Sequence, residues 1–460
     1  MTKIKGGKAI ASGGFGCVFS PALKCDGKKR TDDNISKLMK IKYAKNEFKD
    51  IQRFKGLLDN IPKYDDYFLI NGFSLCKPDK LDDEDRDNFD KKCKAMKKMD
   101  ITASNVNSSL DKLMALNMPY GGIDVGEYIE THKMDYQKMR QMNVSLIQLL
   151  KKGILPMNQR EIFHCDIKDS NILVKEEEGG AVKTRLIDWG LSTTYKSGEN
   201  IPKPLTNRPF QFNVPFSVVL FNDTLTKMYN EFLKKNPEPS FFMVRSFAIN
   251  YIITWVNKRG PGHLKALNSI FKILFERGLI NIETQFKDDL IEFDYTFYFI
   301  FEYVSYVLFK FTKNNNFEKM EYFTQVFIKN LDVWGFVMTY LPILEYLNGY
   351  YSKLCNCELL IIEKIREMIL YIIECSYVPI DVDKIVEKLE DLNELFLCAE
   401  KKSATKFEEK RGTSSTTNSQ QKSKSKSKSK SKSNSNSNSK TKKSSQKLKS
   451  SSKNKTSKNN

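Results

Sequence analysis

The sequence predicts an α+β protein with a small β-rich N-terminal lobe, a large helical C-terminal lobe and a disordered basic tail. Three observations support this fold class. A glycine-rich turn followed by strand-like apolar runs lies within residues 1–120. Residues 218–398 carry Phe, Tyr, Leu and Ile at helical spacing, with few Gly or Pro. From residue 401 onward apolar residues almost vanish, and such a segment cannot bury enough surface to offset its conformational entropy.

The chain divides into four expected parts. Residues 1–120 form the small lobe, and a charge-rich stretch at 76–110 interrupts its strands as an exposed insertion. Residues 121–330 form the large lobe, and residues 331–400 extend it with further helices. Residues 401–460 form the disordered tail, in which Lys and Ser alternate. A chain of 460 residues that is 40% hydrophobic is long enough to bury two such lobes.

The net charge of the chain is concentrated in its tail. Residues 401–460 contain 18 Lys and one Arg against two Glu, a balance of +17 within a total of +19. Residues 1–400 therefore carry only +2, and the globular part is almost neutral. Three roles remain open for such a tail. It binds nucleic acid or acidic surfaces electrostatically, it is a phosphorylated segment, or it only keeps the protein soluble.

The cysteines and apolar stretches favour an intracellular protein without a membrane span. The nine cysteines form no Cys-x-x-Cys pair, and the closest two, Cys355 and Cys357, lack the further ligands of a zinc site. We therefore expect reduced thiols. The N-terminus has no apolar core and does not read as a secretory signal. Residues 295–311 are the most apolar stretch, but Glu302 and Lys310 interrupt it, which favours a buried helix over a membrane helix.

The densest group of chemically active residues lies in a loop followed by a hairpin. Asp166 and Asn171 are five residues apart, too close to belong to separate elements, so both lie on one tight loop. Two short apolar runs follow, at 172–174 and 182–187, with a polar turn that ends in two glycines between them. A hairpin of this length returns the chain to its start. Asp188 is therefore expected beside Asn171.

These side chains suit the transfer of a phosphoryl group. Mg²⁺ prefers hard oxygen ligands and usually takes only one or two from protein, which Asn171 and Asp188 can supply. Asp166 is then free to accept a proton from an attacking hydroxyl. Lys168 can neutralise charge on the transferring phosphoryl group. We therefore predict Asp166 and Lys168 as catalytic residues and Asn171 and Asp188 as metal ligands.

A glycine-rich loop near the N-terminus is the candidate nucleotide site. Its three glycines between residues 13 and 16 let the backbone approach phosphates without interference from Cβ atoms. Phe15 can close the tip of the loop, and Val18 restarts a strand that could cover an adenine ring. Ala11 stands where the first glycine of the usual pattern would be. The residues assigned to ATP in this loop are Ile10, Ala11, Gly13, Gly14, Phe15, Gly16 and Val18.

A lysine on a following strand completes the predicted nucleotide site. Lys37 is flanked by apolar residues at strand spacing within residues 34–39, which suits a side chain that reaches inward to the α- and β-phosphates. The helical pattern of residues 44–58 offers Glu47 as the acidic partner of this lysine, although a gap of ten residues is short for the pairing. Further along the chain, the pair Gly121-Gly122 is typical of the connection between two lobes.

The order of these motifs resembles that of the eukaryotic-type protein kinase superfamily, over about residues 8–330. The resemblance implies a protein-kinase-like fold, ATP and Mg²⁺ as cofactors, and transfer to protein serine or threonine, since Lys168 resembles the serine/threonine pattern. Cys165 stands where Arg is usual, and Trp189 where Phe is usual. We therefore expect activity that does not depend on phosphorylation of the activation segment. The usual Ala-Pro-Glu is missing, and the Pro- and Phe-rich run 208–217 takes its place.

Within that superfamily, residues 13–25, 118–122 and 208–217 look like the divergent serine/threonine kinases of nucleocytoplasmic large DNA viruses. This likeness implies a place in host cytoplasm or the virion. Two alternatives remain open. One is a pseudokinase-like scaffold that binds partners through its helical lobe and tail, and the other is a kinase for a non-protein substrate. The intact set of Lys37 and the three loop and hairpin residues argues against a scaffold, which has no need to keep them.

Overall fold

The structure is a computed structural model that describes residues 7–12, 16–27, 33–279 and 283–412. Residues 1–407 form one compact unit, and residues 408–460 form a second one, of which the structure describes only the end of helix α17 (Val382–Gly412). Most of the tail predicted to be disordered, from residue 413, lies outside the described residues. Its first residues, which the sequence also assigned to the tail, continue α17. The compact unit combines antiparallel sheets with many helices, which confirms the α+β class.

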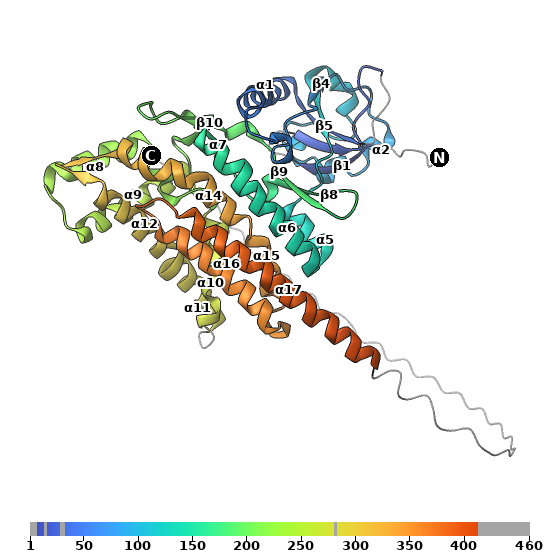
Figure 1. The fold of residues 1–460 in the computed structure, drawn as a ribbon. Coiled ribbons are helices and arrows are strands. Elements are labelled where there is room, and N and C mark those ends of the chain that lie inside the picture. Colours follow the sequence, from blue (N-terminus) through green and yellow to red (C-terminus); the bar gives the residue numbers. More distant parts are fainter. Residues whose placement is uncertain (1–6, 13–15, 28–32, 280–282, 413–460) are drawn as a thin grey trace, which may run out of the picture. The chain divides into compact units, whose positions relative to one another are not determined.

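A five-stranded antiparallel sheet with the order β1-β2-β3-β5-β4 forms the N-terminal part (Figure 1). One face of the sheet turns Cys17, Phe19 and Leu38 into an apolar cluster, and the other face carries Val18 and Lys37, which pair across β2 and β3. Helix α1 (Ile41–Leu58) follows β3 directly. The strands are β1 (Lys8–Ser12), β2 (Gly16–Ser20), β3 (Asn34–Lys40), β4 (Ser74–Cys76) and β5 (Leu113–Pro119).

The charge-rich insertion at 76–110 is not simply exposed, as the sequence suggested. It forms three short helices, α2 (Asp83–Arg86), α3 (Phe89–Lys92) and α4 (Lys94–Lys97). Phe89 and Met96 are buried against Phe19 and Leu38 of the sheet. The scattered apolar side chains among many charges cover one sheet face, while the charged ones remain outside. The stretch does lie between two strands, β4 and β5, and much of it is exposed. The burial of its apolar side chains was not predicted, because the charge-rich composition of the stretch hid their spacing.

Six of the nine cysteines are paired in disulfide bonds, so the expectation of reduced thiols is wrong. Cys17 of β2 is joined to Cys93 of the insertion, and Cys25 is joined to Cys76 of β4. A third bond, Cys357–Cys398, links α16 (Asn356–Glu374) to α17. The spacing of these residues along the chain gave no sign of the pairing, because each bond spans at least 41 residues.

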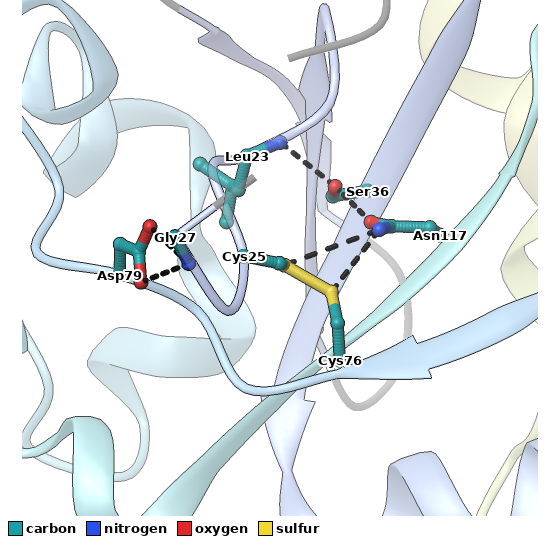
Figure 2. Close-up of a disulfide and its surroundings, with 7 residues drawn as sticks. All are labelled: Leu23, Cys25, Gly27, Ser36, Cys76, Asp79 and Asn117. Atoms are coloured by element: carbon teal, nitrogen blue, oxygen red, sulfur yellow. Dashed lines mark hydrogen bonds between the residues drawn. A yellow bond between two sulfur atoms is a disulfide. The ribbon is translucent and has the colours of Figure 1, made fainter. Parts of the chain in front are cut away.

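Figure 2 shows the Cys25–Cys76 disulfide beside a small polar network at the edge of the sheet. The side-chain amide of Asn117 on β5 donates to Cys76 Sγ at 3.1 Å, and the Ser36 hydroxyl donates to the Asn117 oxygen. The backbone N–H of Leu23 donates to Ser36 Oγ at 2.8 Å. The chain between β2 and β3 is therefore tied to the sheet both covalently and by hydrogen bonds.

The predicted hairpin is confirmed and forms the middle of the unit. β8 (Ile172–Glu176) pairs with β9 (Val182–Leu186), and β6 (Ile123–Asp124) pairs with β8 on its other side. Gly122, just before β6, has φ +99°, and a Cβ there would lie 2.0 Å from the carbonyl oxygen of Val174, so only glycine fits this crossing. The accompanying elements are α5 (Val125–His132), α6 (Tyr136–Gln148), α7 (Leu155–Gln159), β7 (Ile162–Phe163) and β10 (Thr193–Thr194).

The remainder of the unit is helical, as predicted. Helix α14 (Ile328–Met338) is buried along most of its length. The domain boundary expected after residue 330 falls inside it. The stretch 295–311 is confirmed as a buried helix, α12. The other elements are α8 (Asp223–Lys235), α9 (Phe241–Arg259), α10 (Leu264–Phe275), α11 (Thr284–Leu290), α12 (Tyr298–Lys310), β11 (Thr312–Lys313), β12 (Asn316–Phe317), α13 (Lys319–Tyr322) and α15 (Leu341–Gly349).

Candidate active site

Lys37 and Glu47 form an ion pair on the inner face of the sheet. Lys37 Nζ lies 2.7 Å from Glu47 Oε1 and 2.8 Å from Oε2, and the two side chains are 14% and 21% exposed. The short gap between them poses no difficulty because β3 ends at Lys40 and α1 begins at the next residue. Ten residues are enough when a strand runs into a helix without a loop. The lysine is thus held where a phosphate could reach it.

The electrostatics of Glu47 link this pair to the hairpin. Burial raises the pKa of Glu47 above its usual value, Lys37 opposes this shift, and the negative charge of Asp188 adds to it. Asp188 is therefore close enough to Glu47 for the two carboxylates to interact. The Phe54 ring of α1 also stacks on Trp189, next to Asp188, with ring centroids 5.4 Å apart.

The glycine-rich loop is only partly described. Gly13, Gly14 and Phe15 lie outside the described residues. Ala11 on β1 pairs with Val18 on β2, and Val18 pairs with Lys37 on β3, so that the two flanks of the loop lie beside the predicted lysine. Ile10 is exposed and Gly16 is buried at the start of β2.

Asp166 is surrounded by hydrogen-bond donors. Lys168 Nζ lies 2.9 Å from Asp166 Oδ2, and the amide nitrogen of Asn171 donates to the same oxygen at 3.0 Å. Asn213 Nδ2 donates to Asp166 Oδ1 at 2.8 Å. Burial raises the pKa of Asp166, but the charge of Lys168 and the hydrogen bond from Asn213 more than offset it, and the pKa lies below its usual value. The carboxylate is therefore ionised at neutral pH and can accept a proton.

Asn171 and Asp188 are brought together as the hairpin predicted. The backbone N–H of Ile187 donates to the carbonyl oxygen of Asn171 at 3.0 Å, so the two predicted metal ligands lie just outside the adjoining ends of β8 and β9. The amide nitrogen of Asn171 donates to both the carbonyl oxygen and a carboxylate oxygen of Asp166. Its oxygen is thereby left for another partner. The Asp188 residue is exposed and has φ +68°, a left-handed conformation that costs about 1–3 kcal/mol outside glycine.

This donor set fits Mg²⁺ and a nucleotide phosphate. Asn171 and Asp188 offer hard oxygen atoms, and Mg²⁺ usually takes only one or two protein ligands beside water and phosphate. Lys37 supplies positive charge on the sheet side, and Lys168 supplies it beside Asp166. Among the described residues no group of three or more His, Cys, Asp and Glu side chains is gathered for a metal ion.

Asp332 anchors the loop of residues 164–171, which contains Asp166 and is called the catalytic loop after its predicted role. The sequence did not predict this contact. Asp332 Oδ2 accepts the backbone N–H of His164 at 2.8 Å, and Asp332 Oδ1 accepts that of Cys165 at 2.9 Å. Asn158 donates to Oδ2 as well, at 2.7 Å. These bonds offset the cost of burying a carboxylate that is 1% exposed. They also hold Cys165 at φ +63°. The sequence does carry a signal for this role, a lone Asp in a mostly apolar helix, because a buried charge needs partners.

Trp189 packs into an aromatic column behind the loop. Its ring lies 5.1 Å from that of His164 and 5.6 Å from that of Phe68, and it stacks on Phe54 of α1. His164 Nε2 is hydrogen-bonded to the carbonyl oxygen of Ile187 at 2.9 Å. The large ring at this position therefore links α1, which carries Glu47, to the catalytic loop.

Protein-family models give no match to this chain, and neither do curated proteins. The likeness to protein kinases therefore rests on the residue pattern and on the contacts described above. The sequence brought Lys37, Glu47, Asp166, Asn171 and Asp188 into one hypothesis. The structure joins Lys37 to Glu47 and Asp166 to Asn171, and Ile187, next to Asp188, donates to the carbonyl oxygen of Asn171. Across residues 7–12, 16–27, 33–279 and 283–412, no helix is both long and apolar enough to cross a membrane.

Proposed function

We propose that this chain is a serine/threonine protein kinase that transfers the γ-phosphoryl group of MgATP to protein hydroxyls, on a two-lobed protein-kinase-like fold. The observation that carries the proposal is the meeting of two groups of side chains. The Lys37–Glu47 pair lies on the sheet side, and Asp166 with its donors lies on the loop side. Asp188 links them because it lies beside Asn171 and acts electrostatically on Glu47.

Each side chain has a distinct role in the proposed reaction. Asp166, ionised and held by three donors, orients the attacking hydroxyl and accepts its proton. Lys168 stabilises negative charge on the transferring group. Lys37, kept in place by Glu47, binds the nucleotide phosphates. Asn171 and Asp188 would hold the metal of MgATP, which would supply the phosphoryl group.

Two other functions are less well supported. A pseudokinase-like scaffold would not require the strained Asp188, whose left-handed conformation costs free energy to maintain. A kinase for a non-protein substrate remains compatible with the same groups. A viral source, a place in host cytoplasm or the virion, and an acidic partner for the basic tail are parts of the proposal that rest on sequence alone.

The test is transfer of labelled γ-phosphate from MgATP to casein or a basic protein, for the wild type, Asp166→Ala and Glu178→Ala. Asp166→Ala removes the proton acceptor but keeps Asn171 and Asp188, and we expect its transfer rate to fall about 10²- to 10⁴-fold. Glu178 is an exposed carboxylate in the turn of the same hairpin, so its removal should leave the rate unchanged.

Three outcomes count against the proposal. Equal labelling by wild type and Asp166→Ala would point to a contaminating kinase. Absence of labelling by the wild type, with nucleotide bound, would favour the scaffold or a non-protein substrate. Labelling confined to tyrosine in a phosphoamino-acid analysis would overturn the serine/threonine assignment alone.

A further inference from the structure

A short segment, Arg208–Asn213, contacts the catalytic loop directly. Arg208 Nη1 donates to the carbonyl oxygen of Cys165 at 2.9 Å. Asn213 Nδ2 donates to Asp166 Oδ1 at 2.8 Å and to the carbonyl oxygen of Ile167 at 3.2 Å. Arg208, Phe210 and Asn213 are all buried. This clamp segment therefore bonds three consecutive residues of the catalytic loop.

The back of the clamp segment is held by the helical part of the unit. The indole N–H of Trp255 on α9 donates to the carbonyl oxygen of Arg208 at 3.0 Å, and that of Trp334 on α14 donates to Phe212 at 2.8 Å. The backbone N–H of His263 donates to the carbonyl oxygen of Phe210 at 2.8 Å.

Three alternate carbonyls of the segment are thus each bound by a different helical element. Gly262 packs tightly against Phe210, because a Cβ atom added to Gly262 would lie 2.3 Å from the Phe210 carbonyl oxygen. The segment has little room to move away from the catalytic loop.

Arg208 supplies a positive charge next to Cys165, a residue that has none. Its guanidinium lies among Asp166, Asp332 and the buried Cys165 thiol. Burial lowers the pKa of Arg208, and these neighbours oppose the shift. An arginine remains charged under all ordinary conditions. The two carboxylates that build the loop therefore have a fixed, internal counter-charge.

Half of the hydroxyl side chains upstream of the clamp segment are inaccessible. Ser192, Thr193 and Tyr195 are buried, whereas Ser197 is exposed and Thr194 and Thr206 are half-buried. None of the three accessible side chains bonds Arg208 or Asn213 among the interactions of the described residues. A phosphate on any of them would find the contacts to the loop already made.

We infer that Arg208 and Asn213 are positioning residues that keep the catalytic loop assembled without phosphorylation, Arg208 by bridging to the Cys165 carbonyl and Asn213 by orienting Asp166. This inference rests on the proposed kinase function. It assigns a role to the run 208–217, which replaces the usual Ala-Pro-Glu in the sequence. The inference also gives α9 and the loop before α10 an indirect role in catalysis, because they hold the clamp segment in place on the side away from the catalytic loop.

The test uses the full chain made together with a phosphatase, with its mass measured to confirm that it carries no phosphate. The unphosphorylated wild type should retain its full transfer rate. Asn213→Ala should lower kcat about tenfold to a hundredfold, because a hydrogen bond to a charged group is lost, while KM for ATP stays unchanged. Lys203→Ala, an exposed change upstream of the segment, serves as the control.

Rescue by a conservative variant separates positioning from mere stability. Asn213→Ser, which keeps a donor, should restore part of kcat, whereas Asn213→Asp, which places a second carboxylate against Asp166, should not. Should Asn213→Ala not fold, Asn213→Ser and Arg208→Lys carry the same comparison.

The outcomes separate the two proposals. No transfer by the wild type would overturn the kinase function, and this inference with it. Transfer by the wild type that disappears once phosphate is removed would overturn the inference alone. A kcat of Asn213→Ala equal to that of Lys203→Ala, or a kcat of Asn213→Ser no higher than that of Asn213→Asp, would do the same.

Discussion

The two halves of the candidate site are built in different ways. On the sheet side, Lys37 and Glu47 are ten residues apart on consecutive elements, and their contact needs only a strand that runs into a helix. On the loop side, Asp166 depends on Asn213, 47 residues away, and its loop depends on Asp332, more than 160 residues away. The first half is local, and the second is held by the rest of the chain.

The two halves also use different forces. Two disulfides, Cys17–Cys93 and Cys25–Cys76, cross-link the sheet, and its ion pair is partly open to solvent. The catalytic loop has no cross-link among the described residues, and Cys165 within it is a buried free thiol. Buried hydrogen bonds hold it instead. We therefore expect the sheet half to respond to reductants and the loop half to loss of single buried partners.

The largest effect should follow Asp332→Ala. The backbone N–H groups of His164 and Cys165 would lose their acceptor in a buried place, and so would Asn158. Each buried donor left without its acceptor costs about 1–3 kcal/mol of the free energy of unfolding, and three donors lose theirs together. Phosphate transfer should also vanish, because Cys165 would relax from its left-handed conformation.

Urea unfolding followed by circular dichroism measures this change, and Asp111→Ala, at an exposed carboxylate, is the matched control. A loss of stability in Asp332→Ala no greater than in the control would mean that the loop does not need its anchor. The comparison between the two halves would then fail.

The sequence predicted the local features of the site better than the distant ones. The strand with Lys37, the helix with Glu47 and the hairpin that returns Asp188 to Asn171 follow from spacing alone, because each involves neighbouring elements. Arg208 and Asn213 carry no such sign, since their role depends on how a loop without regular structure packs. The disulfides were missed because no spacing announces a bond across 76 residues.

A smaller effect should follow the loss of one sheet disulfide. The Cys17–Cys93 bond restricts the unfolded chain, and its loss typically costs about 2–4 kcal/mol. The double variant Cys17→Ser with Cys93→Ser should therefore lower the melting temperature without reductant, and dithiothreitol, which also reduces Cys25–Cys76, should lower that of the wild type. Amide hydrogen exchange should locate the loosening in β1–β5 and the insertion.

The Cys357–Cys398 bond is the control for this experiment. Removal of that pair should loosen α16 and α17 but leave exchange in the five-stranded sheet unchanged. If the melting temperature is insensitive to reductant in all forms, the thiols are not paired in solution. The stability of the sheet would then rest on its apolar cluster and hydrogen bonds alone.

The smallest effect should be a difference in acid sensitivity between the halves. Burial raises the pKa of Glu47 above 4.5, so the folded protein binds the proton of this carboxyl group more tightly than the unfolded chain does. The contribution of Glu47 to the free energy of unfolding is therefore lost as pH rises through its folded pKa. Asp166 behaves in the opposite way. The pKa of Asp166 lies below 3.8 in the folded protein. Its contribution to the free energy of unfolding is therefore present above pH 3.8 and is lost as pH falls through the folded pKa.

On acidification Glu47 should therefore become neutral while Asp166 is still ionised, and Lys37 loses its partner first. Affinity for ATP, measured with a fluorescent analogue, should decline at a higher pH than transfer from the bound state. Glu47→Gln should weaken binding about twofold to fivefold at neutral pH, as expected for a partly exposed pair, and should abolish the decline. Gln cannot titrate, so a decline that persists in this variant would assign it to another group. The sheet half would then no longer be the acid-sensitive one.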